Sequence, residues 1–131
     1  MPLERLDHVL VLTDDLETTR AFYCDALGFE VGERPPLEFP GYWLYLDGVP
    51  CLHVAERAPY EAHAATLGLR PGEAVDHVAF TGRGYEQVAA RAEAAGADAL
   101  TNTVAGTGLR QLFLTDPNGV RIEVNFQPRE P

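Results

Sequence analysis

Short runs in which hydrophobic and polar residues alternate recur along the whole chain. The run 120–126 shows the pattern best, because apolar residues occupy every second position and polar residues fill the positions between them. Alternation with a period of two predicts a β-strand that is buried on one face only. Together with short apolar runs, this pattern predicts strands over 6–12, 29–32, 42–46, 51–55, 75–81, 99–104, 109–115 and 120–126.

Helical spacing of apolar residues follows the first and the fifth of these strands. The stripe over 16–27 predicts a helix, which Asp14 or Asp15 caps at its start by accepting hydrogen bonds from free N–H groups. Gly28 suits the left-handed position that ends such a helix. A second stripe, over 85–95, predicts another helix that again ends at a glycine.

The tripeptide Asp7-His8-Val9 returns as Asp76-His77-Val78, again at the start of a predicted strand. In both places a strand, a helix and three more strands follow in the same order. The sequence therefore predicts an α+β fold of two tandem βαβββ modules in a single domain, 1–131. Its predicted parts are a first module over 4–56, a linker over 57–74 with a short helix around 60–67, and a second module over 75–127.

The positions of the apolar residues distinguish the two faces of the predicted strands. In the last two strands of each module one face is uniformly apolar, so the helices are expected to cover it. The other face is mixed, which is typical of a surface that meets a ligand. The residues expected on this mixed face are Trp43, Tyr45, His53, Gln111, Phe113, Arg121 and Glu123.

The mixed face has the composition of a metal site. His8 and His77 hold equivalent positions in the repeat, and together with His53 they can place three imidazoles beside the carboxylate of Glu123. These ligands suit Zn, Ni, Mn, Co or Fe(II). We therefore predict ligation by His8, His77 and Glu123, with a histidine that merely fills the core as the alternative. Three roles stay open for His53: a fourth ligand, a proton carrier beside the metal, or support for a ligand.

Composition narrows the possible partners. The chain has a net charge of −10 and its ten basic residues are all arginine, so it repels phosphate backbones and anionic lipid heads. No apolar run is long enough to span a membrane, and no signal peptide is visible. Two cysteines form neither a disulfide framework nor a CxxC pair. We expect a cytoplasmic protein that binds a small molecule and neither nucleic acid nor membrane.

Four motifs carry a family resemblance. They are Leu6-Asp7-His8-Val9, the helix end from Phe22-Tyr23 to Leu27-Gly28-Phe29, Val75-Asp76-His77-Val78-Ala79, and Asp116-Pro117-Asn118-Gly119 leading to Ile122-Glu123-Val124. With these motifs the chain resembles the vicinal oxygen chelate superfamily of glyoxalases, epimerases, fosfomycin- and bleomycin-resistance proteins and extradiol dioxygenases. The resemblance implies that the two modules form a curved mixed sheet, a cup around one divalent metal ion.

The resemblance also implies roles for individual residues. His8, His77 and Glu123 match the family's metal ligands, while His53 stands where glyoxalases carry a glutamate and epimerases a glutamine. Glu123 and His53 are the candidate catalytic residues, and the remaining mixed-face residues would line the substrate cavity. Family chains this short usually form homodimers, often with His8 of one subunit opposite His77 and Glu123 of its partner.

The expected activity is glyoxalase-like in the broad sense. A small molecule would chelate the metal through vicinal oxygens and react by lyase or isomerase chemistry through an enediolate-type intermediate. An extradiol-type Fe(II) ring-cleaving dioxygenase is one alternative, although such enzymes usually carry a tyrosine where Phe113 stands. A metal-free drug-binding protein of the bleomycin-resistance type is another, although such proteins typically lack the ligands that this chain keeps.

Overall fold

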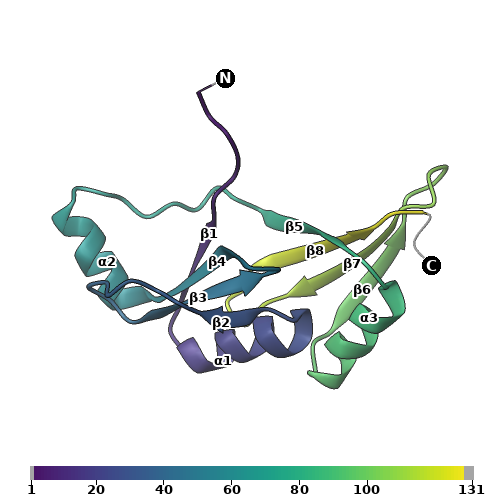
Figure 1. Ribbon diagram of the computed structural model, residues 1–131, viewed down its shortest axis with the longest axis horizontal. Helices are drawn as coiled ribbons and strands as arrows, with labels where there is room; N and C mark the ends of the chain where they lie inside the picture. The colour runs from purple at the N-terminus through teal and green to yellow at the C-terminus, as the bar shows by residue number, and fades with distance from the viewer. Residues whose placement is uncertain (1, 129–131) are drawn as a thin grey trace.

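Two modules of the same topology lie side by side in the computed structural model, which describes residues 2–128 (Figure 1). The first contains β1 (Val9–Thr13), α1 (Leu16–Ala21), the π-helical turn η1 (Phe22–Ala26), β2 (Glu30–Gly32), β3 (Gly41–Leu46) and β4 (Val49–Glu56). The second contains β5 (His77–Gly82), α3 (Tyr85–Ala94), β6 (Ala99–Thr103), β7 (Arg110–Thr115) and β8 (Arg121–Phe126), and α2 (Arg57–Thr66) lies between the modules in sequence. The predicted α+β fold of tandem βαβββ modules is confirmed.

Each module forms its own open, four-stranded mixed sheet. The strand orders are β1-β4-β3-β2 and β5-β8-β7-β6, so the same arrangement is repeated. The first strand of each module runs parallel to the last, and the other neighbours are antiparallel. The last strand of each module therefore lies next to the first. This places His53, on β4, near β1 and Glu123, on β8, near β5.

The first helix follows its sequence signals closely. The side chain of Asp15, rather than Asp14, accepts a hydrogen bond from the Thr18 N–H (3.1 Å) and caps α1. The helix then widens into the π-helical turn η1, which a regular 3.6-residue pattern does not reveal. Gly28 adopts φ +82°, so the left-handed position predicted for it is confirmed.

The uniformly apolar strand faces form one core with the helices. α1 and α3 lie on the same side of the two sheets (Figure 1), and the side chains that face them are almost completely buried. The mixed-face residues are half-buried or exposed, so the predicted assignment of the faces is confirmed. The buried set is Leu44, Leu52, Val54, Leu112, Leu114, Ile122, Val124 and Phe126.

Buried polar contacts join the two modules on the helical side. The hydroxyl of Tyr23, which is fully buried, donates to Asp116 Oδ2 across 2.6 Å, and Asn118 donates to the Thr19 hydroxyl across 3.0 Å. Burial is the main cause that raises the pKa of Tyr23, so its hydroxyl stays protonated and acts as a donor. Asp116 is itself buried and also accepts from two backbone N–H groups of its own turn.

Replacing Tyr23 with phenylalanine is expected to lower the free energy of unfolding by about 1–2 kcal/mol, because Asp116 loses a buried donor. Urea denaturation measures this change. Tyr60→Phe is the matched control, since the described residues give its hydroxyl no hydrogen bond. An equal loss in both variants would contradict a specific role for the Tyr23–Asp116 bond.

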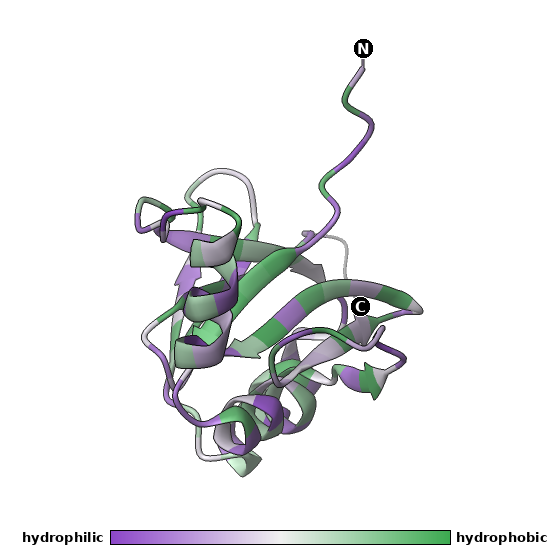
Figure 2. Cartoon of the chain, turned by 90° about the vertical axis from the view of Figure 1, so that its left-hand side faces the viewer, coloured by the Kyte–Doolittle hydropathy of each residue, from purple (hydrophilic) through white to green (hydrophobic). Residues whose placement is uncertain are grey.

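The structure differs from the predicted elements mainly at the start of the chain. β1 begins at Val9, three residues later than predicted, and the N-terminal segment that leads to it extends away from the rest of the molecule (Figure 2). The linker helix α2 begins at Arg57, three residues earlier than predicted. Within residues 2–128, no helix has the length and apolar character needed to cross a bilayer.

Candidate metal centre

The first candidate pair, His8 and His53, lies on the sheet of the first module. His8 directly precedes β1, and β4 pairs with β1 in parallel so that Leu10 is opposite His53. The two imidazole rings stack with their centroids 3.9 Å apart and their planes 12° from parallel. The parallel pairing of β1 and β4 therefore brings together two histidines that are far apart in sequence.

Trp43 extends this stack to three rings. It lies opposite His53 in the β3–β4 register, and its ring stacks on the other face of His53 with centroids 4.2 Å apart. His53 Nε2 donates a hydrogen bond to the Pro50 carbonyl oxygen (3.0 Å), which leaves Nδ1 as the ring nitrogen with a free lone pair. Burial, followed by the charge of His8, lowers the pKa of His53 and favours its neutral form.

The second candidate pair, His77 and Glu123, lies on the sheet of the second module. His77 Nε2 lies 3.7 Å from Glu123 Oε1, and the Glu123 side chain is only 16% exposed. Asn125 donates to Glu123 Oε2 (2.8 Å), and Gln111 lies 3.4 Å from the same oxygen while also donating to Asn125 (3.0 Å). These amides orient the carboxylate and leave Oε1 directed toward His77.

An aspartate holds each of the two repeated histidines by the same ring nitrogen. Asp7 Oδ2 lies 2.8 Å from His8 Nδ1, and Asp76 Oδ2 lies 3.0 Å from His77 Nδ1. A carboxylate can only accept here, so Nδ1 carries the proton and Nε2 keeps the lone pair that binds a metal. The hydrogen bond from the histidine is the leading cause that lowers the pKa of each aspartate, so both stay ionised.

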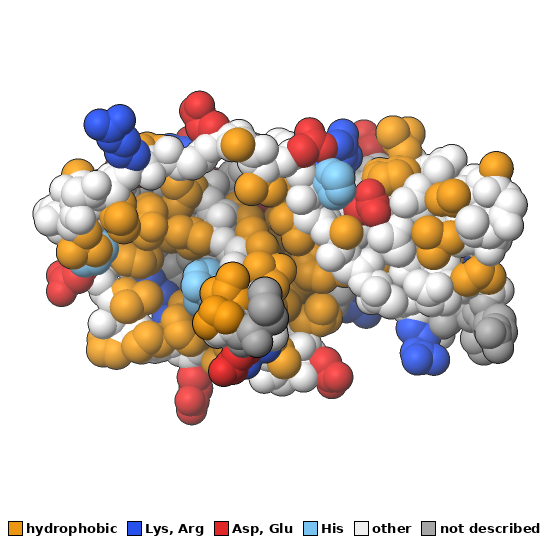
Figure 3. Space-filling model, turned by 90° about the horizontal axis from the view of Figure 1, so that it is seen from above, with side chains coloured by type: hydrophobic (Ala, Val, Ile, Leu, Met, Phe, Trp, Pro, Cys, Tyr) orange, Lys and Arg blue, Asp and Glu red, His pale blue; other side chains and the backbone are white. Residues whose placement is uncertain are grey.

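The two pairs do not come together within one chain. Among residues 2–128 no cluster of three or more histidine, cysteine, aspartate or glutamate side chains is arranged to hold a metal. Figure 3 views the molecule from above, and histidine side chains show there at separate places on the surface. Each sheet thus carries half of the predicted ligand set.

Comparison with known proteins identifies the family. The profile of the Glyoxalase/Bleomycin resistance protein/Dioxygenase superfamily matches residues 5–124, which is most of the chain. The chain belongs to this superfamily. The resemblance described above, on the four motifs, is therefore confirmed.

The proteins that this chain resembles are named for different activities. "Glyoxylase I 4" from Arabidopsis thaliana is 30% identical over 125 residues, which are 93% of this chain and 70% of that protein. A lactoylglutathione lyase from Agrobacterium tumefaciens has a similar fold, with a TM-score of 0.72, 20% identity and coverage of 96% of both chains. A fosfomycin resistance protein from Listeria monocytogenes superposes with a TM-score of 0.70 at 16% identity, covering 98% of this chain and 97% of that one. The shared fold does not by itself select an activity.

The predicted substrate residues of this glyoxalase-superfamily chain lie in three different settings. Trp43 and Tyr45 line a cavity of about 390 Å³ on the first sheet, together with residues 33–35. Gln111 and Arg121 are instead engaged by neighbours, because Gln111 holds the network around Glu123 and Arg121 pairs with Asp76. Phe113 lies opposite Glu123 in the β7–β8 register and places a ring without a hydroxyl beside it.

Two residues in or beside this centre, Asn125 and Arg34, were not among the predicted site residues. Asn125 donates a hydrogen bond to Glu123. The sequence signal for this contact is the spacing of two residues, which places both side chains on the same face of the strand. Arg34 lies in an irregular loop, where no periodicity marks the direction of a side chain.

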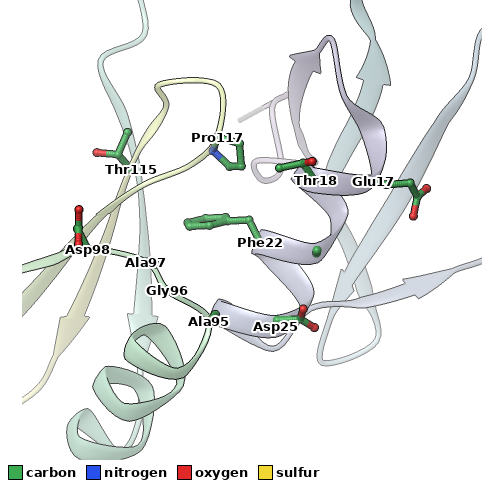
Figure 4. A pocket seen from close by; sticks show the side chains of 11 residues that line it. Glu17, Thr18, Phe22, Asp25, Ala95, Gly96, Ala97, Asp98, Thr115 and Pro117 are labelled. Atoms are coloured by element: carbon green, nitrogen blue, oxygen red, sulfur yellow. The ribbon is translucent and has the colours of Figure 1, made fainter.

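A larger cavity, of about 750 Å³, lies on the helical side of the molecule. η1, the loop after α3 and the β7–β8 turn enclose it, and Phe22 extends into it beneath Pro117 (Figure 4). Its carboxylates include Glu17, which already binds Tyr42 and Arg20. It shares no lining residue with the two ligand pairs, so its size does not make it the candidate metal centre.

Proposed function

We propose that this protein is a metal-dependent lyase or isomerase that acts on a small molecule through two neighbouring oxygen atoms. The proposed ligands are His8, His77 and Glu123. The observation that carries the proposal is the common state of the two repeated histidines, each held by an aspartate at Nδ1 with Nε2 left for a metal.

The donor set fits a divalent ion. Ligand atoms about 2.0–2.2 Å from an ion lie about 3–3.5 Å from one another, and His77 Nε2 and Glu123 Oε1 are 3.7 Å apart, so a small side-chain rotation suffices. Imidazole and carboxylate suit Zn, Ni, Mn, Co or Fe(II). When bound, the ion would supply a positive charge that stabilises negative charge developing on the substrate oxygens.

A second copy of the chain is the proposed source of the missing half of the centre. Large apolar side chains close to His8 and His77 are exposed, with Leu3 at 89%, Leu6 at 82% and Val75 at 81%. Such residues beside polar ligands are typical of a surface that another protein covers. In a two-fold symmetric dimer, His8 of one copy would meet His77 and Glu123 of the other, and two equivalent centres would form.

His53 is proposed to carry a proton rather than to bind the ion through Nε2. Its Nε2–H is engaged by the Pro50 carbonyl, and the stack between His8 and Trp43 fixes the plane of the ring. Nδ1 is the atom that would accept a proton from a carbon next to the chelated oxygens and return it during the reaction. Of the roles that the sequence leaves open for His53, the hydrogen bond to Pro50 supports this one.

The test compares His53→Gln with His8→Ala. His53→Gln is expected to keep about one ion per chain. Its turnover is expected to fall about 100-fold or more, since general acid–base catalysis contributes about 10²–10⁴-fold. His8→Ala is expected to lose the ion itself. Metal content is measured by mass spectrometry after stripping and reloading with each candidate ion, and turnover is measured on 2-oxoaldehyde hemithioacetals and 2-hydroxy carbonyl compounds.

Three results would overturn the proposal. Absence of stoichiometric metal in the wild-type protein under every loading condition would favour the drug-binding alternative. Oxygen uptake with catechols by the iron-loaded protein would favour the dioxygenase alternative. Loss of metal in His53→Gln would make His53 a ligand and remove the proton-carrying role.

A further inference from the structure

The cavity on the first sheet shares a wall with the histidine pair. Its volume is about 390 Å³ and its lining residues are Glu33, Arg34, Pro35, Trp43 and Tyr45. Trp43 forms this shared wall, because it lines the cavity and its ring also stacks on His53. In Figure 3, hydrophobic side chains line a hollow on the left half of the face seen from above, over the first module. A molecule bound at His8 and His53 can therefore extend into this cavity.

Arg34 lies in this cavity wall without a carboxylate partner among residues 2–128. Its Nη2 donates to the Phe39 carbonyl oxygen (2.6 Å), and its guanidinium lies 5.3 Å from the centre of the Phe39 ring. No acidic side chain of the described chain lies within ion-pair distance of it, although the sequence holds twenty aspartates and glutamates. A half-buried guanidinium offers five N–H donors, and only one is used here.

The loop holds Arg34 in place before any ligand arrives. The Phe39 carbonyl fixes one nitrogen, and Gly41 lets the guanidinium approach the backbone, since a Cβ at Gly41 would lie only 3.1 Å from Arg34 Nη2. Burial lowers the pKa of Arg34 itself, as expected for a cation without a compensating anion.

The remaining walls are flat and largely apolar. Tyr45 donates its hydroxyl to the Glu33 backbone carbonyl (2.7 Å), so the ring rather than the hydroxyl faces a ligand. Trp43 and Pro35 complete the surface. The carboxylate of Glu33 belongs to an exposed residue, whereas Arg34 is half-buried, so the positive charge lies deeper than the negative one.

We propose that this cavity is a substrate subsite for a carboxylate carried on a planar group, with the carboxylate on Arg34 and the planar group against Trp43 and Tyr45. The inference rests on the proposed function, because it names the class of molecule that the centre would act on: a planar carboxylate whose two neighbouring oxygens lie at its other end. Arginine matches a carboxylate with two parallel hydrogen bonds, which gives the subsite both charge and orientation.

The first experiment tests the subsite without metal. Protein stripped by chelator is titrated with benzoate and with benzamide, and binding is followed by the fluorescence of Trp43, which is the only tryptophan in the chain. Benzoate is expected to bind about tenfold more tightly than benzamide, as a charge-assisted pair with arginine provides. Arg34→Gln is expected to remove this preference, Arg34→Lys to keep part of it, and Glu33→Gln to keep all of it.

The second experiment adds the chelating oxygens. Metal-loaded protein is titrated with 3,4-dihydroxybenzoate and its neutral amide, which share the same vicinal oxygens. The same preference of about tenfold for the carboxylate is expected, and Arg34→Gln is expected to abolish it without changing metal content. Equal affinity for both probes in wild-type protein, or a preference unchanged in both Arg34 variants, would overturn the subsite.

Failure of the subsite and failure of the metal centre give different results. If the protein never holds stoichiometric metal but stripped protein still prefers benzoate through Arg34, the proposed function fails and the carboxylate subsite stands. If metal binds normally but stripped and loaded protein both ignore the carboxylate, the subsite fails alone. A melting temperature for each variant within a few degrees of wild type excludes misfolding, and Arg34→Lys gives the decision if Arg34→Gln does not fold.

Discussion

Changing Glu123 to glutamine is expected to lower the affinity for a divalent ion about 100-fold or more while leaving the fold intact. Even supporting residues around metal ligands are worth about 10–100-fold in affinity, and Glu123 is placed as a ligand itself. It supplies the one carboxylate of the proposed set. The amide of glutamine keeps the size of the side chain but loses the negative charge and half of the acceptor capacity.

The fold should survive this change because the neighbours of Glu123 can accommodate an amide. Asn125 and Gln111 donate to Oε2, and the remaining oxygen of a glutamine can still accept from them. Glu123 lies on the mixed face of β8, opposite Phe113, and outside the apolar core. The free energy of unfolding of the metal-free protein should therefore change by less than about 1 kcal/mol.

Isothermal titration with the preferred ion measures the affinity, and urea denaturation of the metal-free protein measures the stability. Glu86→Gln is the matched control: this glutamate lies on α3, is exposed, and pairs with Arg110 at 3.8 Å, so the same chemical change should leave metal affinity unchanged. If Glu123→Gln binds the ion as tightly as wild type, Glu123 is a polar residue of the strand face and not a ligand.

The strand faces could be predicted from sequence because a period of two residues reports burial directly. Leu52 and Val54 point into the core and His53 does not, and that difference is visible in the letters alone. The cap at Asp15 and the left-handed Gly28 were predictable for a similar reason, since both depend on local backbone geometry.

Contacts between distant segments could not be predicted in the same way. The stack of His8 on His53 depends on the β1–β4 register, and the bond from Tyr23 to Asp116 depends on how the modules pack. The position of Arg34 depends on a loop without periodicity. The sequence pattern also predicts which ligands share a face, but it contains no distance between the two sheets.

Mixed dimers are expected to restore the metal centre from two inactive chains. If each centre takes His8 from one copy and His77 from the other, a heterodimer of His8→Ala and His77→Ala chains has one intact centre and one that lacks both histidines. This heterodimer should hold about half the metal of the wild-type dimer and show about half its activity. The His8→Ala homodimer and the His77→Ala homodimer should each lack both metal and activity. Co-expression with two different affinity tags isolates the heterodimer.

The reciprocal pairing gives the opposite result and serves as the control. A chain that carries both substitutions, paired with a wild-type chain, damages both shared centres, because each of them needs one histidine from the altered chain. That heterodimer should therefore bind no metal tightly. If each centre instead formed within one chain, the wild-type partner would keep its own centre, and this heterodimer would retain about half of the metal.

A dimer has four His8 and His77 positions, and each heterodimer carries one His8→Ala and one His77→Ala substitution among them. The two heterodimers therefore differ only in how the changes are distributed between copies. Any general cost of losing His8 or His77 is therefore equal in both. Metal in the first heterodimer and none in the second would support a centre built across the dimer. The reverse would place each centre within a single chain. Metal in both would remove His8 or His77 from the ligand set.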